Sequence, residues 1–405
     1  MRVSDSGIPD KTVFPRYVFK RWEKRFAAFL FDVLGTVLWW PLRLLGRAPK
    51  TNVRRILIIR IDHLGDVIMT RPAMRLLAAM FPDARLDLLT SHEASELLRT
   101  DEAISEVIPF ATNWFSRTGS WGAVLSCAHK VCADLRSRRY DLAVDFRGDV
   151  RNIILMAAAG IPERWGYAQT GGGFLLTRRM PYAARLHQVS LNARLVDERA
   201  EVGERPLPFR YSSAAKEAFW RRWSRRLADR RPRIVVHAEA GYPSKRWPAG
   251  RYSALIEGCL AENLGEIILI GTEQEQPALA VSKGWGDKVH DLRGRTTLAE
   301  LPILFDGADV YVGNDSGPAH MAAAQGMAVV SIFSAVNDAP RWRPWTNRLH
   351  LVTRKVHCSP CESRVCPLGH HECMSTIQVE EVMDEIRAVL NAISGREVEK
   401  TWNTK

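Results

Sequence analysis

Two loops of this chain carry polar residues at spacings that suit catalysis. The first, Arg60-Ile-Asp-His-Leu-Gly-Asp-Val67, follows a strand-like apolar run. Asp66 falls at or near the start of a helix, where an aspartate often serves only as a cap. Because ligands bind beyond the carboxyl ends of parallel strands, Asp66 is also a candidate general base for an acceptor hydroxyl. Asp62, His63 and Gly65, in the same loop, are further candidates for contact with the acceptor.

The second loop, Gly313-Asn-Asp-Ser-Gly-Pro-Ala-His320, runs from a strand-like segment into a helical one. The backbone N–H groups and the dipole of such a helix start favour a phosphate, and a glycine lets the phosphate approach closely. The alternative is a loop that only caps its helix, with His320 as an ordinary helix residue. We expect donor-side contacts from Asp315, Ser316, Gly317 and His320.

Two other loops add charges on the same predicted sheet edge. Lys245, in Gly241-Tyr-Pro-Ser-Lys-Arg-Trp-Pro248, can offer a cation to a diphosphate, although a solvated surface lysine is the alternative. Glu273 and Glu275, in Gly271-Thr-Glu-Gln-Glu275, can accept the two hydroxyls of a ribose. All three side chains are therefore candidate donor-binding residues.

Apolar strand-like runs alternate with helical stretches in both halves of the chain, which is typical of parallel α/β sheets. Four such runs occur in the first half: 56–61, 85–90, 104–109 and 141–145. Four more occur in the second half: 233–237, 266–270, 308–312 and 328–333. The polar segment 199–213 is the predicted linker, and a basic helix over 214–229 follows it. The pattern predicts two Rossmann-like domains that face each other across a cleft.

Net charge is concentrated at the start of the chain. The protein has 405 residues and a formal charge of +12. Residues 1–55 hold twelve Lys or Arg against four acidic residues, so they account for eight of these charges. A nucleic-acid binder needs a clustered basic face on its folded part, which the nearly balanced remainder does not offer. We therefore expect no nucleic-acid partner.

The basic segment encloses an apolar stretch, residues 26–40, that Asp32 interrupts. It is short for a bilayer span, which needs about 20 apolar residues. A predicted amphipathic helix can instead lie on an anionic membrane surface, or it can pack on the enzyme itself. Its apolar stripe has helical spacing and comprises Phe19, Trp22, Phe26, Phe29, Val33, Val37 and Trp40.

Seven cysteines occur, and four of them form the cluster Cys358-x₂-Cys361-x₄-Cys366-x₆-Cys373. Several thiolates within a short segment can close a structural zinc site or hold an iron–sulfur cluster. The alternative is a loop of reduced thiols or one stapled by disulfides. The sequence leaves these readings open.

Together these loops resemble glycosyltransferase family 9, the ADP-heptose:lipopolysaccharide heptosyltransferase family, from about residue 54 to about residue 390. The loops ending at Val67 and His320 are similar to its two signature loops, and Lys245-Arg-Trp-Pro248 to a third. The resemblance implies a GT-B fold and a metal-independent inverting mechanism. It also implies that Asp66 is the general base, with Lys245, Asp315 and the Ser316-Gly317 amides around the donor.

The expected enzyme moves heptose or a related sugar from a nucleotide diphosphate, ADP-heptose, to lipopolysaccharide or another lipid-linked envelope glycan. It would need no cofactor for catalysis and would act at the cytoplasmic face of the inner membrane. The alternatives are a GT-B epimerase or hydrolase of sugar nucleotides and a non-catalytic binding protein. The expected divisions are a membrane arm (1–52), an acceptor domain (53–205) and a donor domain (206–395) that includes the Cys-rich segment 357–374.

Overall fold

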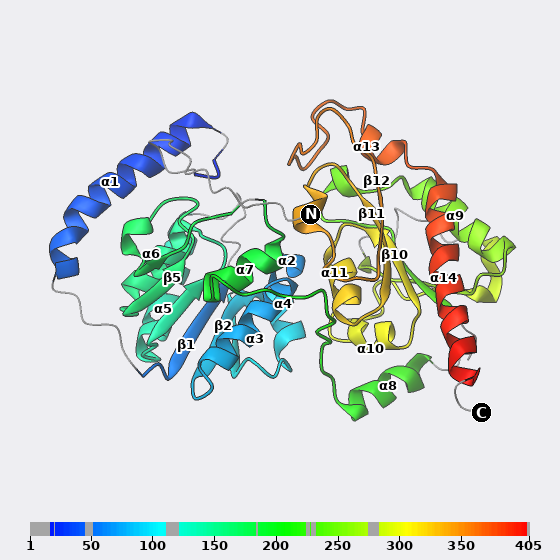
Figure 1. Ribbon diagram of the computed structural model, residues 1–405, viewed down its shortest axis with the longest axis horizontal. Coiled ribbons are helices and arrows are strands. Elements are labelled where there is room, and N and C mark those ends of the chain that lie inside the picture. Colours follow the sequence, from blue (N-terminus) through cyan, green and yellow to red (C-terminus); the bar gives the residue numbers. More distant parts are fainter. Residues whose placement is uncertain are drawn as a thin grey trace. The chain divides into compact units, whose positions relative to one another are not determined.

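The computed structural model describes residues 17–19, 21–44, 52–110, 121–183, 185–223, 227, 232–273 and 283–402. It contains two six-stranded sheets of the α/β class (Figure 1). The predicted residue Glu275 lies outside the described residues, as do residues 1–16 and 45–51 of the predicted arm.

The first sheet has the strand order β3-β2-β1-β4-β5-β6. Its strands are β1 (Arg55–Arg60), β2 (Arg85–Ser91), β3 (Glu106–Phe110), β4 (Leu142–Asp145), β5 (Glu163–Gly166) and β6 (Arg178–Arg179). Parallel pairing of β1 with β4 sets Ile56 opposite Leu142. The connecting helices are α2 (Leu64–Ile68), α3 (Arg71–Met80), α4 (His92–Leu98), α5 (Trp121–Ser137), α6 (Val150–Ala158), η1 (Gly173–Leu175) and α7 (Gln188–Val196).

The second sheet repeats this topology in the order β12-β11-β10-β7-β8-β9. Its strands are β7 (Arg233–His237), β8 (Glu266–Leu269), β9 (Val289–Asp291), β10 (Val310–Asn314), β11 (Ala328–Phe333) and β12 (Leu349–Thr353), and all of its pairs are parallel. Its helices are α8 (Ser213–Trp223), η2 (Pro243–Lys245), α9 (Ala249–Ala261), η4 (Lys283–Lys288), α10 (Leu301–Asp306), α11 (Gly317–Ala324), α12 (Ala339–Trp342), α13 (Glu372–Ser375) and α14 (Val379–Trp402).

The four inner strands of the second sheet, β7, β8, β10 and β11, are buried on both faces because helices cover both. Ile234 and Val236 of β7 belong to one core cluster with Tyr252 of α9 and Ile386 of α14. Side chains alternate along a strand, so the intervening positions face the other way. Tyr311 of β10, for example, packs its ring edge-on against Phe305 of α10, with centroids 6.1 Å apart.

Both sheets change winding direction at one place, between β1 and β4 and between β7 and β10. Loops that follow the strands flanking such a point form the ligand sites of doubly wound sheets. The predicted loops around Asp66, Lys245 and Asp315 follow β1, β7 and β10 respectively. Three of the four strands at the two switch points thus lead into loops singled out from the sequence.

The predicted linker, residues 199–213, contains neither helix nor strand as far as residue 212, and its last residue, Ser213, begins α8. The predicted helix over 214–229 is described only as far as Trp223 and at Leu227. The chain divides into two compact units, residues 1–60, 81–88 and 112–182, and residues 61–80, 89–111 and 183–405. These units are discontinuous in sequence, so the expected division near residue 206 stays a prediction.

The basic N-terminal segment contains a helix, α1 (Trp22–Leu44). Phe19, the first residue of the predicted apolar stripe, lies before the start of this helix. One face of α1 packs against η1. The Asp32 carboxylate accepts hydrogen bonds from the Gly172 backbone N–H (2.5 Å) and the Tyr17 hydroxyl (2.8 Å). Asp32 therefore anchors the helix to the first unit.

Candidate active site

The loop after β10 presents a helix start. Ser316 is the N-cap of α11 and has an extended backbone, and its side chain makes no capping hydrogen bond. Its hydroxyl instead lies 3.2 Å from His237 Nδ1 and 3.3 Å from the Tyr311 hydroxyl. Ser316 is thus the N-cap by position, but its side chain does not serve as the cap. Pro318 has no N–H, and the Ala319 N–H donates to the Ser316 carbonyl (3.1 Å), so the amides that this helix start can offer to an anion are those of Ser316 and Gly317.

Lys245 and Asp315 form a buried ion pair, with Nζ 2.6 Å from Oδ2. Asn337 Nδ2 donates to the same carboxylate oxygen at 3.1 Å, and His320 Nε2 lies 3.9 Å from Oδ1. Burial acts to raise the pKa of Asp315, but Lys245 and His320 outweigh it and hold that pKa below its ordinary value. Asp315 thus stays ionised and fixes a cation beside the start of α11.

This ion pair contradicts the alternative of Lys245 as a solvated surface charge. An ammonium group has three N–H donors, and the bond to Asp315 takes one. The others are suited to phosphate oxygens. Asp315 in turn holds Lys245 in place, and its own expected contact with the donor stays a prediction.

Asp66 lies in the first turn of α2, at its third residue, and is half-buried. The N-cap of α2 is His63, which makes no side-chain cap, so the alternative that Asp66 is the capping residue is wrong. A carboxylate in a first turn still benefits from the helix dipole, by roughly 0.3–1 kcal/mol.

Two glycines let α2 and α11 approach each other, and both helices belong to the compact unit that includes residues 61–80 and 183–405. A Cβ added at Gly65 would lie 2.8 Å from His320 Cδ2, and one added at Gly317 would lie 3.0 Å from Leu64 Cδ2. Side chains larger than hydrogen therefore do not fit without movement at either place. The structure brings the Asp66 loop and the Ser316 loop together, as the sequence predicts.

The ring of His63, an exposed residue, stands edge-on to Tyr242, with centroids 6.4 Å apart. Tyr242 belongs to the loop that carries Lys245, so three of the predicted loops meet in this region. Glu273 is exposed beyond the end of β8, and its role in binding a ribose stays a prediction.

Sequence reasoning missed the buried polar residues that hold these loops in place. Asn314 Oδ1 accepts from the Trp247 backbone N–H (3.0 Å), and its Nδ2 donates to the Ala238 carbonyl (2.8 Å). Glu239, also buried, pairs with Arg246 at 2.8 Å. In the sequence, Asn314 stands out only as a polar residue at the end of a buried strand. It joins the loops after β7 and β10, which supply Lys245 and Asp315.

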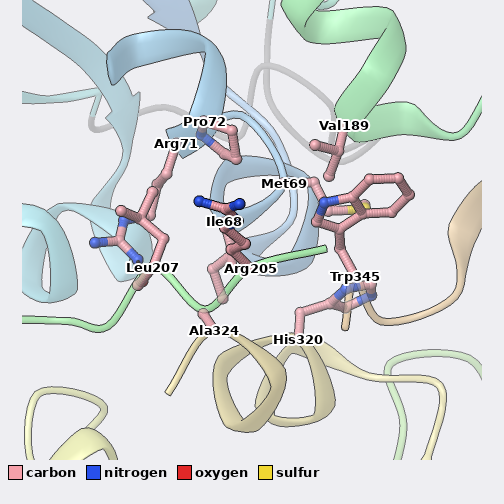
Figure 2. A pocket seen from close by; sticks show the side chains of 10 residues that line it. All are labelled: Ile68, Met69, Arg71, Pro72, Val189, Arg205, Leu207, His320, Ala324 and Trp345. Atoms are coloured by element: carbon pink, nitrogen blue, oxygen red, sulfur yellow. Dashed lines mark hydrogen bonds between the residues drawn. The ribbon is translucent and has the colours of Figure 1, made fainter. Parts of the chain in front are cut away.

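A small pocket lies beside His320 (Figure 2). Figure 2 shows His320 and Ala324 of α11 facing Ile68, Met69 and Pro72. The other lining residues are Arg71, Val189, Arg205, Leu207 and Trp345.

The two arginines of this pocket differ in what they can do. Arg71 is occupied, because it pairs with Asp101 (2.8 Å) and donates to the Pro208 carbonyl (3.0 Å). Arg205 is exposed and offers its guanidinium at the rim. His320 Nδ1 is buried without a hydrogen-bond partner among the described residues. The pocket therefore suits a ligand with polar groups.

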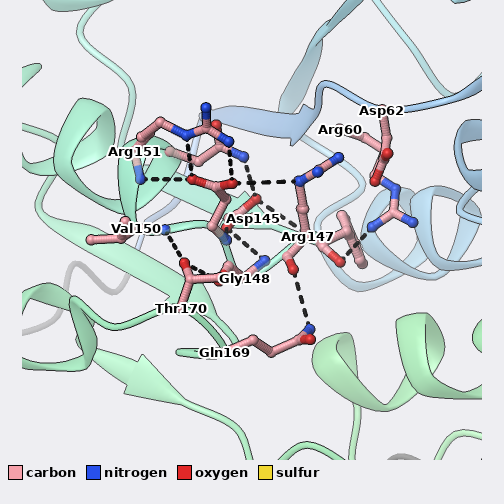
Figure 3. A network of polar contacts seen from close by, with 12 residues as sticks. Arg60, Asp62, Asp145, Arg147, Gly148, Val150, Arg151, Gln169 and Thr170 are labelled. Atoms are coloured by element: carbon pink, nitrogen blue, oxygen red, sulfur yellow. Dashed lines mark hydrogen bonds and ion pairs between the residues drawn. The ribbon is translucent and has the colours of Figure 1, made fainter. Parts of the chain in front are cut away.

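A second polar network shapes the loop after β4 (Figure 3). The buried Asp145 carboxylate accepts hydrogen bonds from the backbone N–H groups of Gly148 (2.9 Å) and Asp149 (3.1 Å) and from Asn152 Nδ2 (2.9 Å). Burial raises the pKa of Asp145 to about 6 despite these donors. Arg60 donates to the Phe146 carbonyl at 2.6 Å, so this signature-loop arginine is structural.

The four clustered cysteines line one pocket with Ser244, Ala335, Val336, His370 and His371. Cys358, Cys361, Cys366 and Cys373 are all free thiols, so the disulfide-stapled alternative is wrong. Backbone N–H groups of residues 368–371 point at Cys366, and that of His371 contributes most to lowering the pKa of the thiol.

Known proteins resemble this chain in sequence and in fold. Residues 128–372 match the model of glycosyltransferase family 9 (heptosyltransferase). Lipopolysaccharide heptosyltransferase 2 of Escherichia coli K12 is 25% identical over 357 residues, covering 83% of this chain and 98% of that protein. Lipopolysaccharide heptosyltransferase 3 of the same strain is 24% identical over 295 residues, covering 70% and 83%.

Among solved structures, E. coli ADP-heptose lipopolysaccharide heptosyltransferase II superposes with a TM-score of 0.70 at 22% identity, covering 84% of this chain and 99% of that one. This likeness confirms the predicted GT-B architecture of two Rossmann-like sheets. The family match covers more than half of the chain and includes the loops of Lys245 and Asp315. The chain belongs to glycosyltransferase family 9 and is a glycosyltransferase.

Proposed function

We propose that this enzyme transfers heptose from ADP-heptose to a lipopolysaccharide acceptor of the cell envelope, with inversion at the anomeric carbon. The names of its relatives support the sugar and the acceptor. The observation that carries the proposal is the Lys245–Asp315 pair beside the start of α11, because Asp315 holds an ammonium group whose remaining N–H donors could bind a leaving diphosphate. Asp66 lies in a helix packed against the same site.

In the proposed reaction, Asp66 removes the proton of the acceptor hydroxyl as that oxygen attacks the anomeric carbon. The new glycosidic bond forms opposite the diphosphate, and the bond from the sugar to the phosphate oxygen breaks. ADP leaves with the electron pair, stabilised by Lys245 and the backbone N–H groups of Ser316 and Gly317. Preorganised donors of this kind stabilise developing anions in other enzymes. The proposal assigns charge neutralisation to these groups, so transfer should proceed without a divalent metal.

Donor recognition can be tested by thermal unfolding with a panel of nucleotides and nucleotide sugars. A ligand that binds only the folded enzyme stabilises it by about 2.7 kcal/mol at a concentration of 100 times Kd. We expect ADP-heptose and ADP to raise the unfolding temperature more than UDP, GDP or their sugars do. A uridine or guanosine donor that stabilises better than every adenosine compound would contradict the assignment of ADP-heptose.

We further propose that α1 docks the enzyme on the cytoplasmic face of the inner membrane as a peripheral protein. No described helix is both long and apolar enough to cross a bilayer. The face of α1 that carries Ala28, Asp32 and Gly35 packs on η1. The opposite face exposes Trp22, Phe26, Leu30, Val33 and Val37.

This exposed stripe has helical spacing and lies between basic flanks, which suits an anionic lipid surface. Both readings of the sequence therefore fit α1, since one face packs on the protein while the other is available to lipid. Solvent-facing rows of large apolar side chains otherwise cost solubility.

Replacing Phe26, Leu30 and Val37 by serine is expected to weaken binding to anionic vesicles by roughly 10²-fold, since each lost apolar side chain costs about 1 kcal/mol. Co-sedimentation with phosphatidylglycerol-containing vesicles measures the loss, while transfer to a soluble acceptor should persist. The matched control is Met80→Ser with Ile154→Ser, two comparably exposed apolar residues on other helices. Equal vesicle binding by wild type and the α1 variant would refute the docking role.

A further inference from the structure

The cysteine loop, residues 357–373, gathers four thiols around one pocket. Cys358 and Cys361 come from its first turn, Cys366 from its middle, and Cys373 from α13. No disulfide joins these four thiols. Four reduced thiols that converge from three places along a loop form a set of soft ligands.

Backbone N–H groups face two of the four thiols, although Cys373 and Ala335 also belong to the hydrophobic core beside the second sheet. Backbone N–H groups of residues 368–371 are directed at the Cys366 sulfur, and that of Ala335 at the Cys373 sulfur. Hydrogen bonds of this type orient thiolate ligands in metal centres. The buried His370 Nε2 has no hydrogen-bond partner among the described residues and borders the same pocket. A metal ion would neutralise thiolates that otherwise repel one another.

We propose that Cys358, Cys361, Cys366 and Cys373 hold one thiolate-preferring divalent metal, Zn²⁺ or Fe²⁺, as a structural site. The spacing Cys-x₂-Cys at the start of the loop supplies one pair of ligands, as in other four-cysteine sites. A competing ligand group exists: among the described residues, the three ligand atoms that already lie within 4.8 Å of one another are those of His357, Cys358 and His370, so the four thiols would have to draw together around an ion. The two sets share only Cys358, so substitutions can separate them.

The cysteine loop is also hydrogen-bonded to Ser244, the residue next to Lys245. The Ser244 hydroxyl donates to the carbonyls of Ser363 (2.6 Å) and Arg364 (2.9 Å). The His371 Nε2 atom lies 2.9 Å from the Ser244 carbonyl oxygen. The position of Lys245 therefore depends on the cysteine loop, and the proposed metal would fix the conformation of that loop.

The same loop holds a second segment of the donor site. The backbone N–H groups of Cys361 and Glu362 donate to the carbonyls of Ala335 (3.3 Å) and Val336 (2.9 Å). The next residue, Asn337, donates to Asp315. The metal thus acts as a positioning element for the Lys245–Asp315–Asn337 group, a role that rests on the proposed donor site.

Metal content tests the site itself without any assay of activity. The full-length protein, purified without chelator, should carry about one equivalent of zinc or iron, the occupancy expected of a closed structural site. Cys361→Ser and Cys366→Ser should abolish it. Cys132→Ser, a thiol outside the loop, and His357→Ala should keep it. Less than about half an equivalent in the wild type, or unchanged content in Cys366→Ser, would overturn the proposal. Loss of the metal in His357→Ala would instead show that the competing ligand group holds it.

The positioning role is tested by removing the metal from the wild-type protein with a chelator and then restoring it. Loss of the metal should weaken ADP binding, measured by calorimetry, by roughly 10–100-fold. An effect of this size is expected when a binding group is misplaced by about 1 Å. Zn²⁺ or Fe²⁺ should restore it, and Co²⁺ should give thiolate-to-cobalt absorption. Equal ADP affinity with and without metal would overturn the role. Lys245→Met should keep the metal but weaken ADP binding, whereas failure of the donor assignment would leave ADP binding unaltered in that variant.

Discussion

Replacing Asp66 with asparagine is expected to lower kcat by roughly 10²–10⁴-fold, the usual contribution of a general base. Asparagine keeps the size of the side chain but cannot accept the acceptor proton. Asp66 does not cap α2, so the variant should fold normally. Steady-state kinetics at saturating donor measure the loss, and calorimetry should show ADP affinity close to that of the wild type.

Asp62→Asn is the matched comparison, because it removes a carboxylate from the same loop. The Asp62 Oδ1 atom accepts a hydrogen bond from the adjacent His63 backbone N–H, which an asparagine oxygen can also accept. We expect the loss of kcat in Asp62→Asn to stay below about tenfold, short of the contribution of a catalytic base. If Asp66→Asn were as active as Asp62→Asn, Asp66 would not be the base.

Replacing Lys245 with methionine is expected to weaken ADP binding by roughly 10–100-fold, because hydrogen bonds to charged groups contribute about 1.5–3 kcal/mol. The same change leaves the buried Asp315 carboxylate without its cation. Breaking a buried pair in this way destabilises a protein by roughly 3–5 kcal/mol. Calorimetric titration with ADP and chemical unfolding measure the two effects separately.

The double variant Lys245→Met with Asp315→Asn separates binding from stability. A neutral amide at residue 315 no longer carries an uncompensated charge, so most of the lost free energy of unfolding should return. ADP affinity should not return, since the cation is still missing. Recovery of both quantities would mean that Lys245 acts only as the structural partner of Asp315.

The strands were predictable where they are long, apolar and internal. Ile56–Ile59 of β1 and Arg233–His237 of β7 lie inside their sheets and are buried. The missed strands β6, β9 and β12 are edge strands, which have only one neighbour and tolerate polar residues such as Arg178–Arg179. β5 was missed although it is internal, because Glu163-Arg-Trp-Gly166 lacks an apolar run.

The site residues that could be predicted are those in loops that follow predicted strands. Asp66, Lys245 and Asp315 were found because they follow buried strands. Their contacts were not, because residues 245 and 315 meet only once β7 pairs with β10. Gly65 was singled out only as an acceptor-side candidate, whereas the structure shows that it leaves space for His320. Close approach of two helices leaves no local signal in a sequence.

The central claim is inverting heptosyl transfer, and the configuration of the product tests it most directly. The enzyme is incubated with ADP-heptose and a lipopolysaccharide core acceptor in the presence of a divalent-metal chelator under conditions that leave the cysteine loop loaded. The anomeric configuration of the newly attached sugar is then determined by NMR. The proposed single displacement predicts a glycosidic bond of the configuration opposite to that of the donor. Retained configuration, or transfer only from a different nucleotide sugar, would contradict it.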